Sequence, residues 1–536
     1  KTYRDIRLVG TPQESVGKFG GDTDNWEWPR HTADFSVFRV YMSKDGKPAE
    51  HSAENIPYKP KHFLPVSIKG IKDGDYAMIY GYPGGTNRYE TSNGIQLKTA
   101  IDNPSLVTLR DVRLKLMKEQ MVKDPAVKLK LAANYANVAN YWKFFDGESR
   151  QLKKFRTYEE KQAYENKFAA WAKGKPGYEN IFADYTKNYE TWTPYAKSRV
   201  YLNEGILGSP LAKYASTLIK LEADLVKTGV SSADAKKTMD AATAARKKYL
   251  EDANRPSDEK IIAATAQMFY NDVDKNQHPI GFYEGIKAAY GDLREDATFK
   301  KWAKDVFDKT MILDDTKWDA FVANPDANVL QNDPAFAYAA AFVKSYNTKY
   351  APIFKAFTEK NDELGRAYLK GVMEMNPAAA AKMYPDANFS MRVSYGNVKS
   401  YSPRDGLKCD YICTSKGILE KYVPGDYEFD FPVKGIELLK NKDFGQYIDK
   451  GKKDLVVTFI TNNDITGGNS GSPVIDGSGN LIGLAFDGNS EALSHKLAVD
   501  KELNRAICVD IRYVLWCIDK LGGASNIIKE LKLVKQ

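Results

Sequence analysis

The pattern of apolar and polar residues changes twice along the chain. In residues 1–94, glycine and proline separate short runs that are rich in β-branched and aromatic residues. Residues 34–43 (DFSVFRVYMS) and 75–83 (DYAMIYGYP) are two such runs, and their composition is typical of β-strands. We therefore predict that this N-terminal part forms β-sheet.

Residues 95–385 have a different pattern, in which Ala, Lys, Glu and Leu are frequent and glycine is rare. Within residues 105–121 the apolar side chains recur at helical spacing, at Leu109, Val112, Leu116, Met117 and Met121. A second helical stretch, residues 257–273, opens on Ser257, a residue type suited to an N-cap. This pattern predicts a large helical region.

Glycines and short apolar runs return in residues 386–536. Residues 472–476 (SPVID) and 481–486 (LIGLAF) flank the turn sequence GSGN, which predicts a β-hairpin. Residues 510–521 (DIRYVLWCIDKL) predict a closing amphipathic helix. The order β–α–β favours an α+β fold in which a helical domain is inserted into a β-domain; three consecutive domains are the alternative.

Composition narrows the class of protein. With 536 residues, 43% of them hydrophobic and 28% charged, the chain is long enough for two or three globular domains. The net charge of +8 comes from lysines spread through the middle of the chain. Because no basic stripe is interleaved with aromatic residues, a solvated helical surface is favoured over a nucleic-acid interface. No apolar run approaches the roughly 18 residues of a membrane helix.

Several common sites are absent from the sequence. The four cysteines form no C-x-x-C pair, which argues against zinc and thioredoxin-like chemistry; disulfides are possible but not indicated. There is no phosphate-binding loop, dinucleotide fingerprint or H-E-x-x-H motif. Residues 272–283 begin like a calcium loop, but Gln277 and Tyr283 stand where Gly and Glu are needed. We expect neither a metal nor a cofactor.

The sequence GGNSGSP at residues 467–473 has the pattern of a nucleophile turn. A reactive serine needs a tight turn and backbone N–H groups that face the developing oxyanion. Gly468 and Gly471 flank Ser470 and permit such a turn, and the N–H groups of Gly468 and Ser470 are the expected oxyanion donors. Because a strand follows, this resembles the turn of chymotrypsin-like proteases and not the α/β-hydrolase elbow. A structural Gly/Ser turn is the alternative.

Residues 20–39 (GGDTDNWEWPRHTADFSVFR) are the second unusual stretch. His31 and Asp34 are three residues apart on an extended segment, so their side chains tend to point to opposite faces. We therefore interpret His31 as structural. In double-barrel proteases the chain order is His, Asp, Ser, which places the expected base upstream of Lys1. The opening sequence KTYRDIRLVG has no Met or signal peptide, so we interpret the chain as a fragment or processed chain without a complete triad.

Several blocks together resemble one family, the bacterial serine dipeptidyl peptidases that include dipeptidyl peptidases 7 and 11. The blocks are FGGDTDNWEWPRHTADFSVFR, YGYPGGTNRY, ANYWK, TGGNSGSPVIDGSGNLIGLAFDGN and DIRYVLW, in the family's order and over nearly the whole chain. The resemblance implies a chymotrypsin-like double β-barrel with an inserted helical cap domain. The expected domains are residues 1–94 and 386–536, which form the peptidase barrels, and residues 95–385, which form the cap.

The resemblance also implies roles for single residues. Asp34 matches the catalytic Asp and Ser470 the nucleophile, while the base of the family is a histidine in an N-terminal segment that this chain does not contain. The family grips the free α-amino group of its substrate, and the matching positions are Asn25, Trp26, Asn140 and Asp487.

The resemblance implies that the residue after Asp487 lines the pocket for the side chain of the substrate's second residue. Where dipeptidyl peptidase 11 carries an Arg that pairs with acidic substrates, this chain has Gly488, which favours an apolar second residue. Ala33 and Ser490 depart from the Gly and Trp that are usual in relatives.

From these residues we predict a serine exopeptidase that releases dipeptides from free peptide N-termini. A chymotrypsin-like endopeptidase is one alternative, and a non-catalytic peptide-binding module is another, because the catalytic His is absent from this chain. The resemblance further implies a homodimer in the periplasm or at the cell surface of a Gram-negative bacterium.

Overall fold

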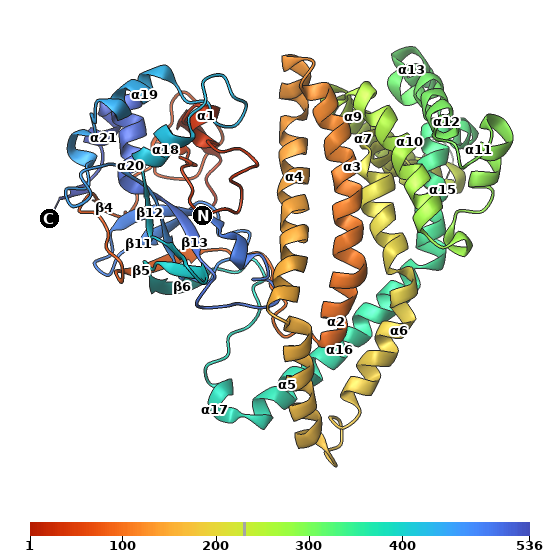
Figure 1. The fold of residues 1–536 in the computed structure, drawn as a ribbon. Helices are drawn as coiled ribbons and strands as arrows, with labels where there is room; N and C mark the ends of the chain where they lie inside the picture. Colours follow the sequence, from red (N-terminus) through yellow and green to blue (C-terminus); the bar gives the residue numbers. More distant parts are fainter. Residues whose placement is uncertain (229–231, 536) are drawn as a thin grey trace. The chain divides into compact units, whose positions relative to one another are not determined.

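The computed structural model describes residues 1–228 and 232–535, and these form two compact units (Figure 1). Unit 1 combines Lys1–Tyr89 with Tyr384–Gln536, and unit 2 is Glu90–Met383. Two segments that are far apart in the sequence therefore build one unit, and the whole of unit 2 lies between them in the chain.

Unit 1 holds the sheets of the described residues. The strands of the first sheet, in order, are β1 (Asp5–Gly10), β2 (Val37–Met42) and β3 (Ile56–Pro57). The main path of the nine-stranded sheet runs β6 (Arg392–Asn397), β5 (Tyr76–Gly81), β11 (Ser472–Ile475), β12 (Leu481–Gly488), β13 (Ala506–Asp510), β10 (Val456–Thr461) and β9 (Ile412–Thr414). Off this path are β4 (Val66–Ser67) and β14 (Leu533–Val534), while β7 (Tyr401–Arg404) and β8 (Leu407–Cys409) form a separate pair.

The predicted hairpin is confirmed. Strands β11 and β12 pair antiparallel, with Ser472 opposite Ala485 and Pro473 opposite Leu484. Strand β5 pairs with both β11 and β6, so strands from before and after unit 2 lie side by side in one sheet.

The α+β class is confirmed, but no strand ladder of the described residues closes into a barrel. The sheet is an open path from β6 to β9. Its β6 end approaches β10 through an isolated bridge between Val398 and Thr461 and a 3.0 Å hydrogen bond from Asn462 N to Asn397 O. The structure therefore supports antiparallel sheets, which is a coarser statement than the predicted double barrel.

Short helices pack on the sheet of unit 1: α1 (Glu14–Gly17), α18 (Ser415–Lys421), α19 (Val433–Lys440), α20 (Ile511–Trp516) and α21 (Ser525–Lys529) (Figure 1). The predicted helix at residues 510–521 is α20 followed by a π-helical turn, Cys517–Leu521. Asp510 caps it, since its side chain accepts from Arg512 N. The fully buried Trp516 belongs to the apolar core beneath the sheet.

Unit 2 is helical throughout its described residues. Its helices are α2 (Ser92–Leu97), α3 (Asn103–Met121), α4 (Pro125–Lys154), α5 (Thr157–Ala172), α6 (Ile181–Val200), α7 (Pro210–Thr217), α8 (Ile219–Thr228), α9 (Ala233–Asp252), α10 (Arg255–Asp272), α11 (Phe282–Tyr290), α12 (Asp296–Lys309), α13 (Asp315–Ala323), α14 (Ala327–Asn332), α15 (Pro334–Lys349), α16 (Ala351–Met375) and α17 (Pro377–Ala380). Helix α3 buries Leu109, Met117 and Met121, as its spacing predicts.

The predicted N-cap of the second helical stretch is wrong. Helix α10 begins at Arg255, and Asn254 is its cap, because the Asn254 side chain accepts a hydrogen bond from Ser257 N. Pro256 can stand in the first turn of a helix, where its missing N–H has no partner to lose, so the helix starts earlier than Ser257.

Candidate active site

The segment Thr466–Ser472 folds into a tight turn that leads into β11. Asn469 closes it, since Asn469 N donates to Thr466 O (3.0 Å), Ser472 N donates to Asn469 O (2.9 Å), and the Asn469 side chain accepts from Thr466 N (3.1 Å). Gly468 has φ +107°, and a Cβ there would lie 2.4 Å from Tyr82 O. Only glycine fits that position, so the turn depends on the predicted glycine.

Ser470 is exposed at this turn. Its Oγ lies 3.5 Å from Phe486 O on the neighbouring strand β12. Across the described residues, no protein group accepts a hydrogen bond from the N–H of Gly468 or Ser470. A reachable hydroxyl beside two available amide donors is the arrangement that nucleophilic acyl transfer requires.

Asp34 lies at the end of the buried stretch formed by His31, Thr32 and Ala33. Its side chain reaches solvent, yet partial burial raises the pKa of its carboxyl, and the charge of Asp487 raises it further. The Arg30 guanidinium opposes this effect and lowers the pKa. Asp34 is thus electrostatically coupled to the group around Asp487.

Asp487 is the centre of a buried polar cluster. Its Oδ2 accepts hydrogen bonds from Trp26 N (3.1 Å) and Arg30 Nη1 (2.6 Å), and its Oδ1 accepts from Gly488 N (2.9 Å). The structure therefore brings together Trp26 and Asp487, two of the residues predicted to hold the substrate amino group. Asn25 is half-buried and adjoins Trp26 in sequence.

Arg30 is a site residue that the sequence did not reveal. It forms a buried ion pair with Asp487, in which each side chain is 8% exposed. Its Nε donates to Thr32 Oγ1 (2.6 Å) and its Nη1 to Asp24 O (2.9 Å), and its guanidinium lies 5.1 Å from the centre of the Phe486 ring. These contacts fix the cation against the Asp487 carboxylate, close enough to Asp34 to lower its pKa.

Gly488 faces Trp26. A Cβ at Gly488 would lie 3.4 Å from the Trp26 ring and 3.6 Å from both Ala492 Cβ and Arg505 O, which are ordinary contacts. Ser490 is half-buried nearby, with its Oγ 3.5 Å from Glu491 Oε2. A Cβ atom can therefore be placed at position 488 without a backbone clash.

His495 contacts the first residue of the turn, Thr466. It is buried, its Nδ1 lies 2.6 Å from Ala492 O and its Nε2 lies 2.9 Å from Thr466 Oγ1. Because a carbonyl only accepts, Nδ1 carries the proton and Nε2 accepts from Thr466. The Trp26 ring stacks on it at 6.3 Å, and burial lowers the pKa of His495 to about 4. This histidine positions the turn and does not contact the Ser470 hydroxyl.

The other histidines lie elsewhere. His31 is buried, and its desolvation lowers its pKa to about 3. His51 contacts the Asp5 carboxylate at 3.0 Å, His62 is exposed, and His278 lies in unit 2. In the part of the chain that the structure describes, no hydrogen bond joins a histidine to Ser470.

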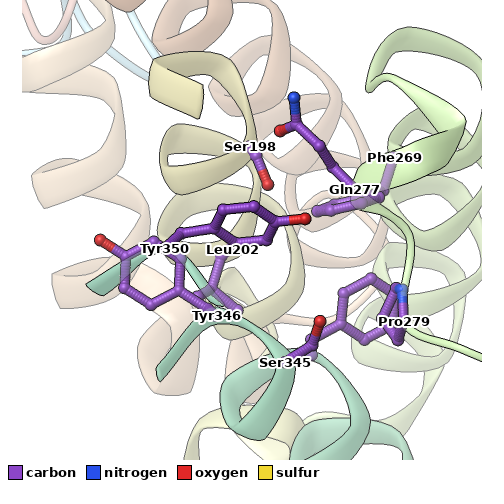
Figure 2. Close-up of a pocket in the computed structure, with 9 residues that line it drawn as sticks. Ser198, Leu202, Phe269, Gln277, Pro279, Ser345, Tyr346 and Tyr350 are labelled. Carbon is purple, nitrogen blue, oxygen red and sulfur yellow. The ribbon is translucent and has the colours of Figure 1, made fainter. Parts of the chain in front are cut away.

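Asn140 lies half-buried on α4 in unit 2, so its role in binding the substrate stays a prediction. A small pocket also lies in this unit, where the side chains of Ser198, Gln277 and Ser345 converge (Figure 2). Gln277 Oε1 and Ser345 Oγ have no hydrogen-bond partner among the described residues. A small pocket that contains two unpaired polar oxygen atoms suits a bound water.

No group of three or more metal-ligating side chains occurs within residues 1–228 and 232–535, and the four cysteines are free thiols. Among the described helices, none is long and apolar enough to cross a bilayer.

A glycine-flanked serine that leads into an antiparallel hairpin, with amide donors beside it, is the arrangement found at the nucleophile turn of serine peptidases. The sequence profile described as Peptidase S46 matches residues 1–533, and the chain belongs to this family.

The chain is similar to named relatives over almost its whole length. It is 41% identical to the dipeptidyl-peptidase 7 of Capnocytophaga gingivalis, over 99% of this chain and 73% of the relative. It is 39% identical to the Asp/Glu-specific dipeptidyl-peptidase of Flavobacterium psychrophilum, over 100% of this chain and 73% of the relative. The crystal structure of Porphyromonas endodontalis DPP11 with the dipeptide Arg-Glu matches with a TM-score of 0.89 at 31% identity, over 99% of this chain and 75% of that one.

Proposed function

We propose that this protein is a serine dipeptidyl aminopeptidase. One observation carries the proposal: the buried Asp487 cluster directly follows Phe486, whose carbonyl faces Ser470 Oγ at 3.5 Å. A carboxylate so close to the nucleophile can hold a substrate ammonium group about two residues, or roughly 7 Å of extended chain, from the scissile bond. The names and bound dipeptide of the relatives support the same activity.

In the proposed reaction, Ser470 Oγ attacks the carbonyl carbon of the second substrate residue while a general base takes its proton. The N–H groups of Gly468 and Ser470 stabilise the oxyanion. The C–N bond then breaks, the peptide leaves as an amine that takes the proton from the base, and water hydrolyses the dipeptidyl ester. We assign to Asp34 the orientation of the base.

We place the general base on a histidine outside residues 1–536. The occupied nitrogens of His495 and the positions of the other four histidines support this assignment. We also propose a chymotrypsin-like double barrel, which the Val398–Thr461 bridge supports on the β6 side, and a homodimer in the periplasm or at the cell surface.

For the substrate we propose an apolar second residue, because Gly488 leaves the pocket uncharged. The relatives of this chain include both dipeptidyl-peptidase 7 and Asp/Glu-specific enzymes, so their names do not decide the preference for the second residue. The proposed preference therefore rests on the uncharged Gly488 alone.

The test compares dipeptidyl reporters with free and N-acetylated termini, using the whole protein. We expect cleavage of free reporters with Leu in the second position, little cleavage of acetylated ones, and none by Ser470→Ala. Equal turnover of acetylated reporters would instead identify an endopeptidase. Binding of dipeptides without any turnover would identify a peptide-binding module.

A further inference from the structure

A second loop, residues 82–85, contacts the first half of the Thr466–Ser472 turn, which contains Gly467 and Gly468. Gly84 N donates to Gly467 O at 2.7 Å, and the space beside Gly468 is filled by Tyr82 O. The backbone of this loop is therefore in direct contact with the segment that supplies an oxyanion donor.

Phe389 covers the same loop. Its N–H donates to both Pro83 O (2.8 Å) and Gly84 O (2.9 Å), and its ring would touch a Cβ on Gly84 at 3.0 Å. Phe389 has φ +63°, which is strained for a residue with a side chain, and it is 71% exposed. The two backbone hydrogen bonds, and not packing of the ring, therefore hold Phe389 in this conformation, and the exposed ring is open to a ligand.

The two halves of the turn contact different segments of unit 1. The second half rests on β12, where Gly471 N donates to Ala485 O and where Asp487 and Gly488 follow. The first half rests on the loop that carries Tyr82. A peptide whose first two residues occupy the β12 side must pass Ser470 and continue on the other side.

We propose that Tyr82 and Phe389 form the subsite for the residue that follows the scissile bond, and that this subsite favours an apolar or aromatic side chain. The inference rests on the proposed dipeptidyl peptidase function. Tyr82, whose backbone carbonyl adjoins Gly468, is 57% exposed, so its side chain is open to a substrate at the turn. An aromatic contact of this kind changes kcat/KM by roughly tenfold.

The experiment measures dipeptide release by the whole protein from two tetrapeptide amides, Ala-Leu-Phe-Ala and Ala-Leu-Gly-Ala. We expect the first to be cleaved about tenfold faster in kcat/KM by the unmodified protein. Phe389→Ala should reduce this ratio to below about threefold.

Phe389→Gly separates binding from folding. Glycine adopts φ +63° without strain, so this variant should keep or raise its melting temperature while it loses the selectivity. Tyr395→Ala is the matched control, since Tyr395 on β6 is also an exposed aromatic residue (75%), and its replacement should leave the ratio unchanged.

Release of dipeptides with no preference at the third residue would overturn this inference alone, as would full selectivity in both Phe389 variants. If no dipeptide is released from either peptide, the proposed function fails, and this inference fails with it.

Discussion

The ion pair between Arg30 and Asp487 can be tested by a double-mutant cycle. Its N–O distance is 2.6 Å and both side chains are 8% exposed, so neither charge is well solvated. Arg30→Met keeps the length of the side chain and removes its charge. Leaving one partner of a buried ion pair alone costs about 3–5 kcal/mol. The hydrogen bonds from Trp26 N and Gly488 N remain, so we expect the lower end, about 3 kcal/mol.

The second variant is Asp487→Leu, and the third combines both changes. With no charge left, the double variant should recover much of the loss, because an apolar pair of similar volume is often as stable as the ion pair. We therefore expect a coupling energy of about 2 kcal/mol from urea unfolding of the four proteins. Losses that add to within about 0.5 kcal/mol would refute the argument that the two charges depend on each other.

The same variant has a catalytic readout. Arg30 lowers the pKa of Asp34, so Arg30→Met should raise that pKa and move the acid limb of kcat/KM to higher pH. Arg512→Met is the control, because Arg512 pairs with Asp510 at 2.7 Å, with both side chains 2% exposed, away from the turn. It should destabilise the protein without moving the acid limb. A shift of equal size in both variants would contradict the assignment.

Three further outcomes follow from the structure. Gly468→Ala places a Cβ 2.4 Å from Tyr82 O and should lower kcat/KM by at least about 100-fold. Gly471→Ala meets open space, so it should cost only about 1–2 kcal/mol of stability. Similar losses of kcat/KM in the two variants would contradict the special role of Gly468. The pKa of His495 is about 4 in the folded protein, below its ordinary value of 6.5, so the unfolded state binds its proton first as pH falls. Stability should decrease by about 3 kcal/mol between pH 6.5 and 4, and His495→Gln should flatten this dependence in thermal melts. Gly488→Arg should shift reporter preference from Leu to Glu in the second position, and an unchanged preference would remove Gly488 from the pocket.

The helices and strands were predicted well because each depends on residues that are close together in the sequence. The alternation in residues 472–486 and the helical spacing in α3 each depend on side chains within one or two turns. The N-cap of α10 was misplaced because Ser257 and Asn254 are both good capping residues, and a proline decides between them.

The site was only partly predictable. Ser470 and Gly468 belong to a motif whose turn is local, so their geometry could be anticipated. Arg30 and Asp487 are 457 positions apart, and no spacing rule relates them. The exposed Phe389 gives no sequence signal either, since its contact with Pro83 depends on two segments that the whole of unit 2 separates.

The discontinuity of unit 1 has a consequence for synthesis. Strand β5 leaves the ribosome before unit 2, but its partners β6 and β11 follow it, with Ile79 paired to both Ser394 and Val474. At about 5–20 residues per second, β5 waits roughly 20–80 s for β11 to emerge. Unit 2 has time to fold during this interval, while β5 keeps an unpaired edge that can associate with other nascent chains. Of the two units, unit 1 is therefore completed later during translation, and it depends more on protection while β5 waits for its partners.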